Sequence, residues 1–182
     1  SRTSRVSVEE RTLPRMLIVG DAKSPLIRER GFIGQRAGHE IFWVSPFAAQ
    51  LAGVRVFAPP EGIKSMRAVR QLALAFVLRR AISVVRPELI HVHYAYQALA
   101  TNSLCGFHPL VVSVMGGDVL PDQSYRGYGK RFVRRLLDAA DRITSKSEFL
   151  DTALASIGDY GHKVRRITWG IDLSHYSPMR DT

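Results

Sequence analysis

Short apolar runs alternate with helical stretches along nearly the whole chain. Continuous apolar strands that are separated by helices are typical of a parallel sheet that is covered on both faces. The sequence therefore predicts an α/β fold, a doubly wound, mostly parallel, Rossmann-like sheet of about seven strands with helices on both faces. The predicted strands are 16–19, 40–44, 54–57, 89–92, 110–114, 142–145 and 164–168.

The predicted helices have recognisable starts and stops. Ser24, which is followed by proline, is a favourable N-cap, and Gly38 ends the helix that begins there. Inside this helix Gly31 and Gly34 each cost about 1 kcal/mol relative to alanine. The longest predicted helix, 66–85, is apolar all round in its middle, which predicts burial against a sheet rather than a surface position. Further helices are predicted up to 104, at 129–140 and at 148–156.

The 182 residues are enough for one folded domain with a proper core. Residues 1–14 lack an apolar core and are predicted to form a disordered extension, which leaves 15–182 as the domain. The longest apolar run, 72–78, is far shorter than the roughly 20 residues that cross a bilayer. The single cysteine, Cys105, cannot form an internal disulfide and is interpreted as a small core residue in a helix. A reducing, cytoplasmic compartment fits this interpretation.

The chain carries a formal net charge of +10, from 26 basic and 16 acidic side chains. Such an excess favours an anionic partner: a phosphate-bearing ligand, an anionic membrane surface or nucleic acid. Aromatic side chains are not interleaved with the basic clusters, and no recognition motif is present. Nucleic acid is therefore not predicted as a partner.

One basic segment contains no acidic residue. Helical spacing places Arg131, Arg134 and Arg135 on one side of a helix, opposite an apolar face. This arrangement is either a solvated helix face or a foothold on anionic lipid, where each basic residue contributes about 1 kcal/mol. The predicted location is therefore the cytoplasm, with a peripheral position at the inner membrane face left open. The candidate membrane-contact residues are Arg126, Lys130, Arg131, Arg134 and Arg135.

In an open parallel sheet, ligands bind at the carboxyl ends of the strands, at the point where the strand order reverses. Turn-forming and polar residues follow most of the predicted strands, although strand-to-helix turns need such residues for capping in any case. The candidate substrate-binding residues at these ends are Gly20, Asp21, Ser24, His93, Tyr94, Gly116, Gly117, Asp118, Lys146, Gly170 and Asp172.

Two of these strand ends allow a closer interpretation. Gly20 and Asp21 with Ser24 either present backbone N–H groups to a phosphate or form a plain turn and cap. The segment lacks the G-x-G-x-x-G fingerprint of dinucleotide-binding proteins, and no Walker motif exists in the chain. After 110–114, the glycine pair before Asp118 allows another molecule to approach the backbone closely. Asp118 then either accepts hydrogen bonds from the hydroxyls of a sugar-like ligand or caps its own loop.

Two histidines alternate within one predicted strand and so point to the same face. A metal site would need further ligands, and none is evident nearby, so no metal is predicted. His91 is interpreted as a hydrogen-bonded core residue. His93 lies nearer the end of the strand and is a candidate for ligand contact.

The order of five segments resembles the N-terminal domain of family-4-like glycosyltransferases of the GT-B fold, over about residues 16–179. The resemblance is carried by the strand and loop 17–25 running on to 36–41, the strands within 86–94 and 108–118, the segment 141–148 and the tail 164–178. Each segment alone is a weak signal, but the five occur in the family's order and at its spacing.

The resemblance implies transfer of a sugar, of the hexosyl type, from a nucleotide-sugar donor to an acceptor hydroxyl, with retention of anomeric configuration and without cofactor or metal. The acceptor is a sugar, a lipid-linked compound or another hydroxyl. The N-terminal domain is implied to contact mainly the acceptor, while a C-terminal domain beyond this chain holds the donor. Gly20 would line the donor phosphate side, and Gly170 and Asp172 would lie near the interdomain hinge. By itself the chain is predicted to be inactive.

One departure from the family pattern concerns catalysis. Many members have a catalytic histidine where this chain has Met115, so that role cannot be carried over, and Asp118 and His93 are the remaining catalytic candidates. The alternative interpretation is a non-catalytic GT-B-like module that associates with a membrane or a partner protein.

Overall fold

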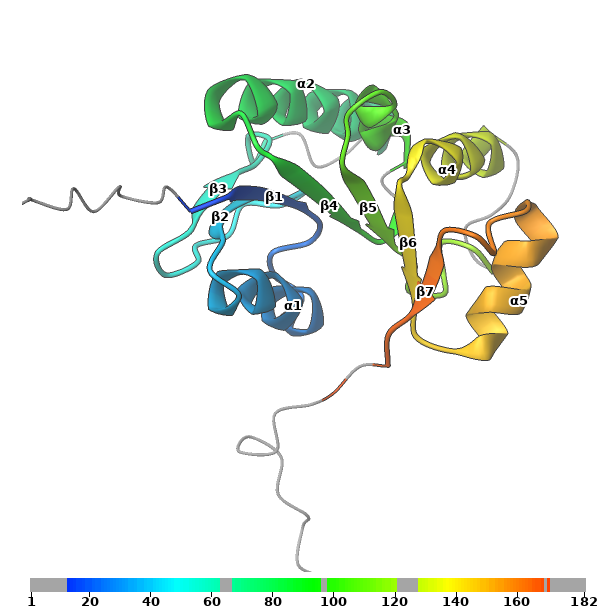
Figure 1. Ribbon diagram of the computed structural model, residues 1–182. Coiled ribbons are helices and arrows are strands. Elements are labelled where there is room, and N and C mark those ends of the chain that lie inside the picture. Colours follow the sequence, from blue (N-terminus) through cyan, green and yellow to red (C-terminus); the bar gives the residue numbers. More distant parts are fainter. Residues whose placement is uncertain (1–12, 63–66, 96–97, 121–127, 169, 171–182) are drawn as a thin grey trace, which may run out of the picture.

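The computed structural model describes residues 13–62, 67–95, 98–120, 128–168 and 170 (Figure 1). Two predicted site residues, Arg126 and Asp172, lie outside this described part, as do residues 1–12 of the predicted extension. Among the described helices, none combines the length and the apolar character needed to cross a membrane.

Seven strands form one sheet in which every neighbouring pair is parallel, which confirms the predicted fold class. The order across the sheet is β3-β2-β1-β4-β5-β6-β7. The chain therefore moves from β1 towards one edge, returns, and then moves towards the other edge, so that β1 and β4 flank the point of reversal. The strands are β1 Arg15–Val19, β2 Glu40–Val44, β3 Arg55–Phe57, β4 Leu89–His93, β5 Leu110–Ser113, β6 Arg142–Ser145 and β7 Val164–Arg166.

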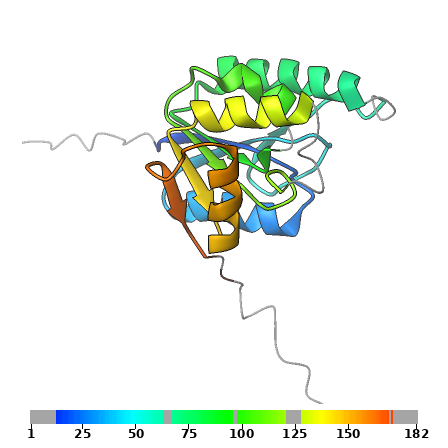
Figure 2. The same cartoon turned by 90° about the vertical axis from the view of Figure 1, so that its right-hand side faces the viewer.

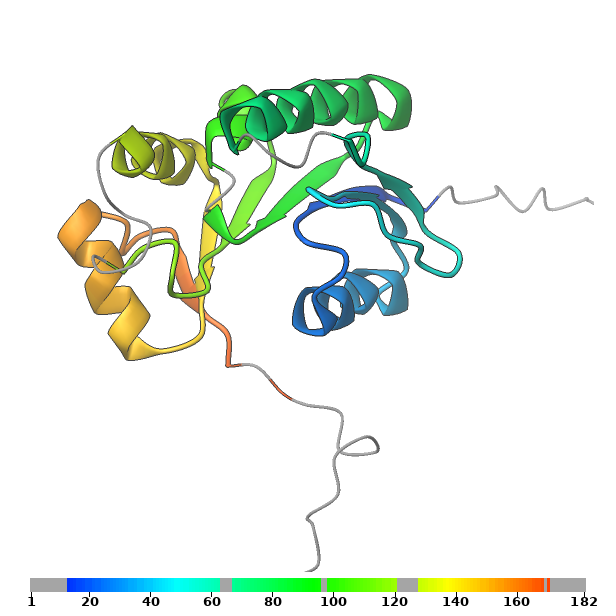
Figure 3. The ribbon, with the colours of Figure 1, turned by 180° about the vertical axis from the view of Figure 1, so that it is seen from behind.

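The helices lie on both faces of the sheet, as predicted. Figure 1 shows α2, α3 and α4 above the sheet and α1 below it, with α5 beside β6 and β7, and Figure 3 shows the same layers from behind. The described helices are α1 Pro25–Arg36, α2 Arg67–Val85, α3 Ala98–Thr101, the 3-10 helix η2 Asn102–Leu104, α4 Tyr128–Ala139 and α5 Glu148–Ile157.

The core divides at the sheet into a larger and a smaller apolar cluster. The larger one joins the strands to the inner sides of α2, α4 and α5. The smaller one lies between α1 and the sheet and is centred on Trp43, whose indole is fully buried. A Cβ at Gly31 would lie 2.2 Å from the Trp43 ring. The glycine that weakens α1 as a helix is therefore what allows the helix to pack on β2.

The prediction that α2 is buried against a sheet rather than placed at the surface is confirmed for its inner side and wrong for its outer side. Its inner side is buried through Gln71, Leu74, Leu78, Ala81 and Val85, which recur at helical spacing. Its outer side is exposed and carries apolar residues such as Leu72 and Phe76 together with Arg79 and Arg80.

The interpretation of Cys105 as a core residue is also wrong. Cys105 follows η2 and is half-buried, and its Sγ lies 3.8 Å from the carbonyl oxygen of Arg135. Its sequence neighbour Leu104 belongs to the core, whereas Cys105 lies in the turn after η2, where the chain returns to the surface.

Candidate functional site

The loop that follows β1 is held tightly against the ends of two neighbouring strands. Gly20 donates its N–H to the carbonyl of Val44 at 3.0 Å, and its own carbonyl accepts from the Trp43 indole N–H at 2.8 Å. A Cβ at Gly20 would lie 3.2 Å from the Cβ of His93. The absence of a side chain at Gly20 therefore lets this loop lie directly against the carboxyl end of β4.

Asp21 and Ser24 shape the turn into α1. Asp21 Oδ1 accepts from the N–H of Lys23 at 2.9 Å, and its carbonyl accepts from the N–H of Ser24 at 3.1 Å. Ser24 occupies the N-cap position, as predicted, but its side chain makes no capping hydrogen bond. The first turn of α1 thus presents N–H groups that the cap residue does not satisfy, next to the point of reversal of the sheet.

At the carboxyl ends of the strands, His93 is unusual because it is a buried polar side chain without a hydrogen-bond partner among the described residues. Its side chain is 1% exposed, and neither Nδ1 nor Nε2 has a hydrogen-bond partner among the described residues. Burial, together with the nearby charges of His91 and Arg30, holds the pKa of His93 well below its ordinary value. The ring is therefore neutral at physiological pH, with one nitrogen able to donate and the other to accept. Since buried polar groups are almost always paired, an unpaired one calls for an explanation.

His91 supports His93 from the interior of the sheet, and it is hydrogen-bonded as interpreted from the sequence. The two rings lie on the same face with centroids 4.0 Å apart. His91 Nε2 lies 2.8 Å from Ser113 Oγ, which in turn lies 2.6 Å from Thr144 Oγ1. Burial, and secondarily the charge of Arg30, lowers the pKa of His91 to about 4. A row of neutral polar groups thus crosses β4, β5 and β6.

Tyr94 has a strained backbone directly after β4. Its φ is 73°, a region that non-glycine residues rarely adopt and that costs of order 1–3 kcal/mol. The N–H of Tyr94 donates to the carbonyl of Ser113 at 3.0 Å, which holds this conformation in place. Strain of this kind concentrates at ligand-binding sites.

Asp118 joins the loop after β4 to the loop after β5. It is fully buried, and one carboxylate oxygen accepts from the N–H of Ala95 at 2.8 Å. The other accepts from the N–H groups of Met115 and Gly116, at 3.0 and 2.9 Å. Burial raises the pKa of Asp118, while these backbone hydrogen bonds oppose the rise. The geometry supports the loop-cap alternative, and direct contact of Asp118 with a ligand stays a prediction.

The remaining residues of this loop contribute backbone and an apolar side chain. Gly116 has a φ of 126°, which favours glycine, and Gly117 is half-buried. Met115 is partly buried against the smaller core cluster under α1. The position at which the family resemblance implies a histidine is therefore occupied here by an apolar contact.

The structure brings some of the predicted site residues together and leaves others apart. Gly20 and His93 are in contact, and Tyr94 is joined through Ala95 and Asp118 to the loop that contains Met115 and Gly116. Lys146 is exposed after β6, which lies two strands from β4. Gly170 is exposed beyond the end of β7. These last two residues are not part of the cluster at β1 and β4.

The candidate membrane-contact residues within the described part lie on α4. Lys130, Arg131, Arg134 and Arg135 are exposed, while the opposite side of α4 enters the larger core cluster. This is the amphipathic arrangement predicted from the spacing. A solvated helix face and a lipid-binding face would both have this arrangement, so membrane contact through α4 stays a prediction.

Sequence reasoning missed one residue that supports the site. Ser45 is fully buried, and its Oγ accepts from the N–H groups of Ala22 and Phe47, at 3.1 and 3.3 Å. It directly follows β2, so the rule that selects strand ends would have found it. Among the described residues, no three side chains of the types that hold a metal lie together.

The fold defines a class: a parallel, doubly wound α/β domain whose strand order reverses between β1 and β4, the place where open sheets of this kind bind ligands. Residues 35–175 match the family model described as Glycosyltransferase Family 4. The chain belongs to this family. A comparison with curated protein sequences finds no match.

Solved structures with the same fold are glycosyltransferases of the GT-B type. Sucrose-phosphate synthase from Thermosynechococcus elongatus superposes with a TM-score of 0.71 at 13% identity, covering 91% of this chain and 50% of that one. Anabaena HepE in complex with UDP and glucose gives 0.63 at 18% identity, covering 91% and 47%. The lipopolysaccharide outer core galactosyltransferase WaaB gives 0.61 at 12% identity, covering 92% and 50%. The chain thus spans about half the length of these proteins.

Proposed function

We propose that the chain is the acceptor-side half of a retaining glycosyltransferase that uses a nucleotide sugar and transfers a hexosyl group. The observation that carries the proposal is the family match over residues 35–175. Because the chain spans about half of each similar structure, the proposal assigns most donor contacts to a second domain and no transfer activity to these residues alone. A nucleoside diphosphate sugar is the proposed donor, since HepE was solved with UDP and glucose.

The loop after β1 is proposed to face the donor diphosphate. Gly20 keeps the loop flat against β4, and the first-turn N–H groups of α1 are available because the Ser24 side chain does not cap them. Such N–H groups and the helix dipole stabilise anions. During transfer they would stabilise the negative charge that develops on the leaving diphosphate.

His93 is proposed to orient a hydroxyl of the bound sugar or acceptor. Its two buried nitrogens have no hydrogen-bond partner within the part of the chain that the structure describes, and a neutral imidazole can both accept from and donate to a hydroxyl. In the proposed reaction the acceptor hydroxyl attacks the anomeric carbon of the donor sugar. His93 would bind and position a reactant in this step without carrying a charge, and no metal ion or cofactor is proposed.

One observation favours the alternative of a non-catalytic binding module. Met115 is an apolar, partly buried contact at the position where the family resemblance implies a catalytic histidine. The same crevice would then bind a sugar-containing ligand without transferring it.

Replacement of His93 by phenylalanine tests the proposed role in the protein that joins this chain to its second domain. Phenylalanine keeps an aromatic ring, though a larger one, and removes the two buried nitrogens, so the gain from burying no polar atom offsets the tighter packing and the melting temperature should change little. The value of kcat/KM for nucleotide-sugar turnover, measured by release of the nucleoside diphosphate, should fall by about tenfold or more because a hydrogen bond to a reactant is lost.

The control is His108→Phe. His108 is exposed and precedes β5, so it lies at the amino ends of the strands and not at the carboxyl ends. Its Nδ1 lies 2.9 Å from Oδ2 of Asp141. This change should leave turnover unaltered. Full activity of His93→Phe would remove His93 from the reaction, and absence of turnover in the unsubstituted two-domain protein would favour the binding module.

A further inference from the structure

Exposed apolar residues form a short stripe on the outer side of α2, and exposed basic residues follow it along the helix. Val69, Leu72 and Phe76 are exposed large hydrophobic residues at helical spacing on the side opposite Leu74, and Arg79 and Arg80 come after them. Leu72 is 65% exposed and Phe76 is 68% exposed. Isolated exposed hydrophobic residues are common, but a contiguous stripe along one helix marks an interaction surface.

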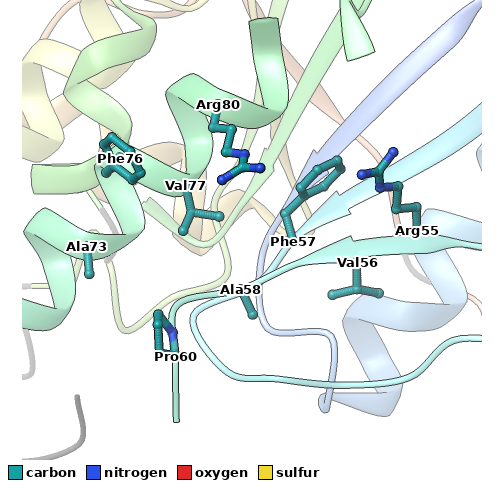
Figure 4. A pocket seen from close by; sticks show the side chains of 9 residues that line it. All are labelled: Arg55, Val56, Phe57, Ala58, Pro60, Ala73, Phe76, Val77 and Arg80. Atoms are coloured by element: carbon teal, nitrogen blue, oxygen red, sulfur yellow. The ribbon is translucent and has the colours of Figure 1, made fainter. Parts of the chain in front are cut away.

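A groove between α2 and the edge strand β3 extends this stripe. It has a volume of about 610 Å³, and its apolar lining includes Phe57, Phe76 and Val77. Figure 4 shows the guanidinium groups of Arg55 and Arg80 on either side of the Phe57 ring. The Arg55 guanidinium lies 4.8 Å from the centre of that ring. The apolar surface therefore has cations at its border.

The charged residues in the sequence of α2 are all of one sign. Helix α2 contains four arginines, at 67, 70, 79 and 80, and no acidic residue. Figure 2 shows α2 and α4 on the same face of the sheet, and α4 carries exposed basic residues of its own. A protein partner would need a matching acidic surface around an apolar centre, whereas an anionic bilayer offers both a plane of phosphates and an apolar interior.

We propose that the outer face of α2, together with the groove at β3, docks on an anionic lipid bilayer. Leu72 and Phe76 enter the acyl region at its boundary, while Arg55, Arg79 and Arg80 contact lipid phosphates and keep their charged ends in the headgroup layer. This surface differs from the basic face of α4, because it combines insertion of apolar side chains with charge. The proposal does not depend on the transfer reaction.

Sedimentation of the chain with lipid vesicles tests the proposal. Vesicles that contain phosphatidylglycerol should bind the chain, and vesicles of phosphatidylcholine alone should not, because the arginines need anionic headgroups. Phe76→Ser should weaken binding about tenfold through loss of apolar burial. Arg79→Gln with Arg80→Gln should weaken it about fivefold for each charge removed, an effect that added salt should also produce.

The matched control is Phe149→Ser, because Phe149 on α5 is 67% exposed and lies outside the proposed surface. Its binding should equal that of the unsubstituted chain. Equal binding to neutral vesicles, no binding to either kind, or the same loss in Phe76→Ser and Phe149→Ser would overturn the proposal. Loss of binding in an Arg131→Gln, Arg134→Gln, Arg135→Gln variant with retention in Phe76→Ser would move the contact to α4. Self-association that depends on Phe76 would instead show an interface between copies of the chain.

Discussion

Replacing Asp118 with alanine is expected to lower the free energy of unfolding by about 3 kcal/mol, because three backbone N–H groups, two of them buried and one partly buried, lose their acceptor. These N–H groups belong to Ala95, Met115 and Gly116, and they tie the loops after β4 and β5 together. For a chain of this length the melting temperature should fall by about 6–12 °C, which thermal unfolding followed by circular dichroism measures. Amide exchange at the three donors should also accelerate.

The control for this change is Asp159→Ala. Asp159 is exposed, and an exposed substitution of this kind should alter stability by less than about 0.5 kcal/mol. If Asp118→Ala unfolds at the temperature of the unsubstituted chain while the amide exchange is unaltered, the carboxylate does not hold the loops. Its buried position would then need another explanation, such as the ligand contact that the sequence left open.

Gly31→Ala is expected to destabilise the fold by about 2 kcal/mol, although alanine is the better helix former. The added Cβ would lie 2.2 Å from one ring atom of Trp43 and 2.6 Å from another. The ring cannot move away freely, because it is fully buried and its Nε1 donates to the carbonyl of Gly20. Thermal unfolding should show a decrease of about 4–8 °C. Intrinsic fluorescence should change as the environment of Trp43 changes.

Gly34→Ala, one helical turn further on, is the matched comparison. Its Cβ would lie 2.9 Å from the sulfur of Met16 and 3.0 Å from Cδ1 of Ile41, and both atoms lie at or near the ends of side chains that can shift at lower cost than the Trp43 ring. The gain in helix propensity of about 1 kcal/mol should then make this variant as stable as the unsubstituted chain or more so. Equal losses in both variants would mean that the packing of Trp43 against Gly31 does not limit the structure.

The sheet could be predicted from the sequence because a strand buried on both faces is a continuous apolar run. All seven predicted strands are present, and their boundaries agree to within a few residues of the predicted ones. What the pattern could not show was the environment of α2. A helix with apolar residues on every side has the same sequence pattern whether its outer side meets protein or solvent, so the exposure of Leu72 and Phe76 could not be predicted from it.

The position of the candidate site could be predicted from the sequence, but the roles of its individual residues could not. The rule that ligands bind at strand ends selected Gly20, His93 and Asp118, and the structure places all three at the carboxyl edge. It could not indicate that Asp118 accepts hydrogen bonds from backbone N–H groups, whereas the buried His93 ring has no hydrogen-bond partner among the residues that the structure describes. Both are polar residues at a strand end, and only the packing of neighbouring loops separates their surroundings.

An NMR titration of the 182-residue chain with UDP-glucose tests most directly the claim that the edge at β1, β4 and β5 is one wall of a nucleotide-sugar crevice. Each tenfold in affinity corresponds to about 1.4 kcal/mol, so a site that lacks its second wall should bind only in the millimolar range. Chemical shifts should change in the loops 20–24, 94–95 and 115–118 and not around His108. Micromolar binding, or changes confined to the opposite edge or to the groove at β3, would contradict this account.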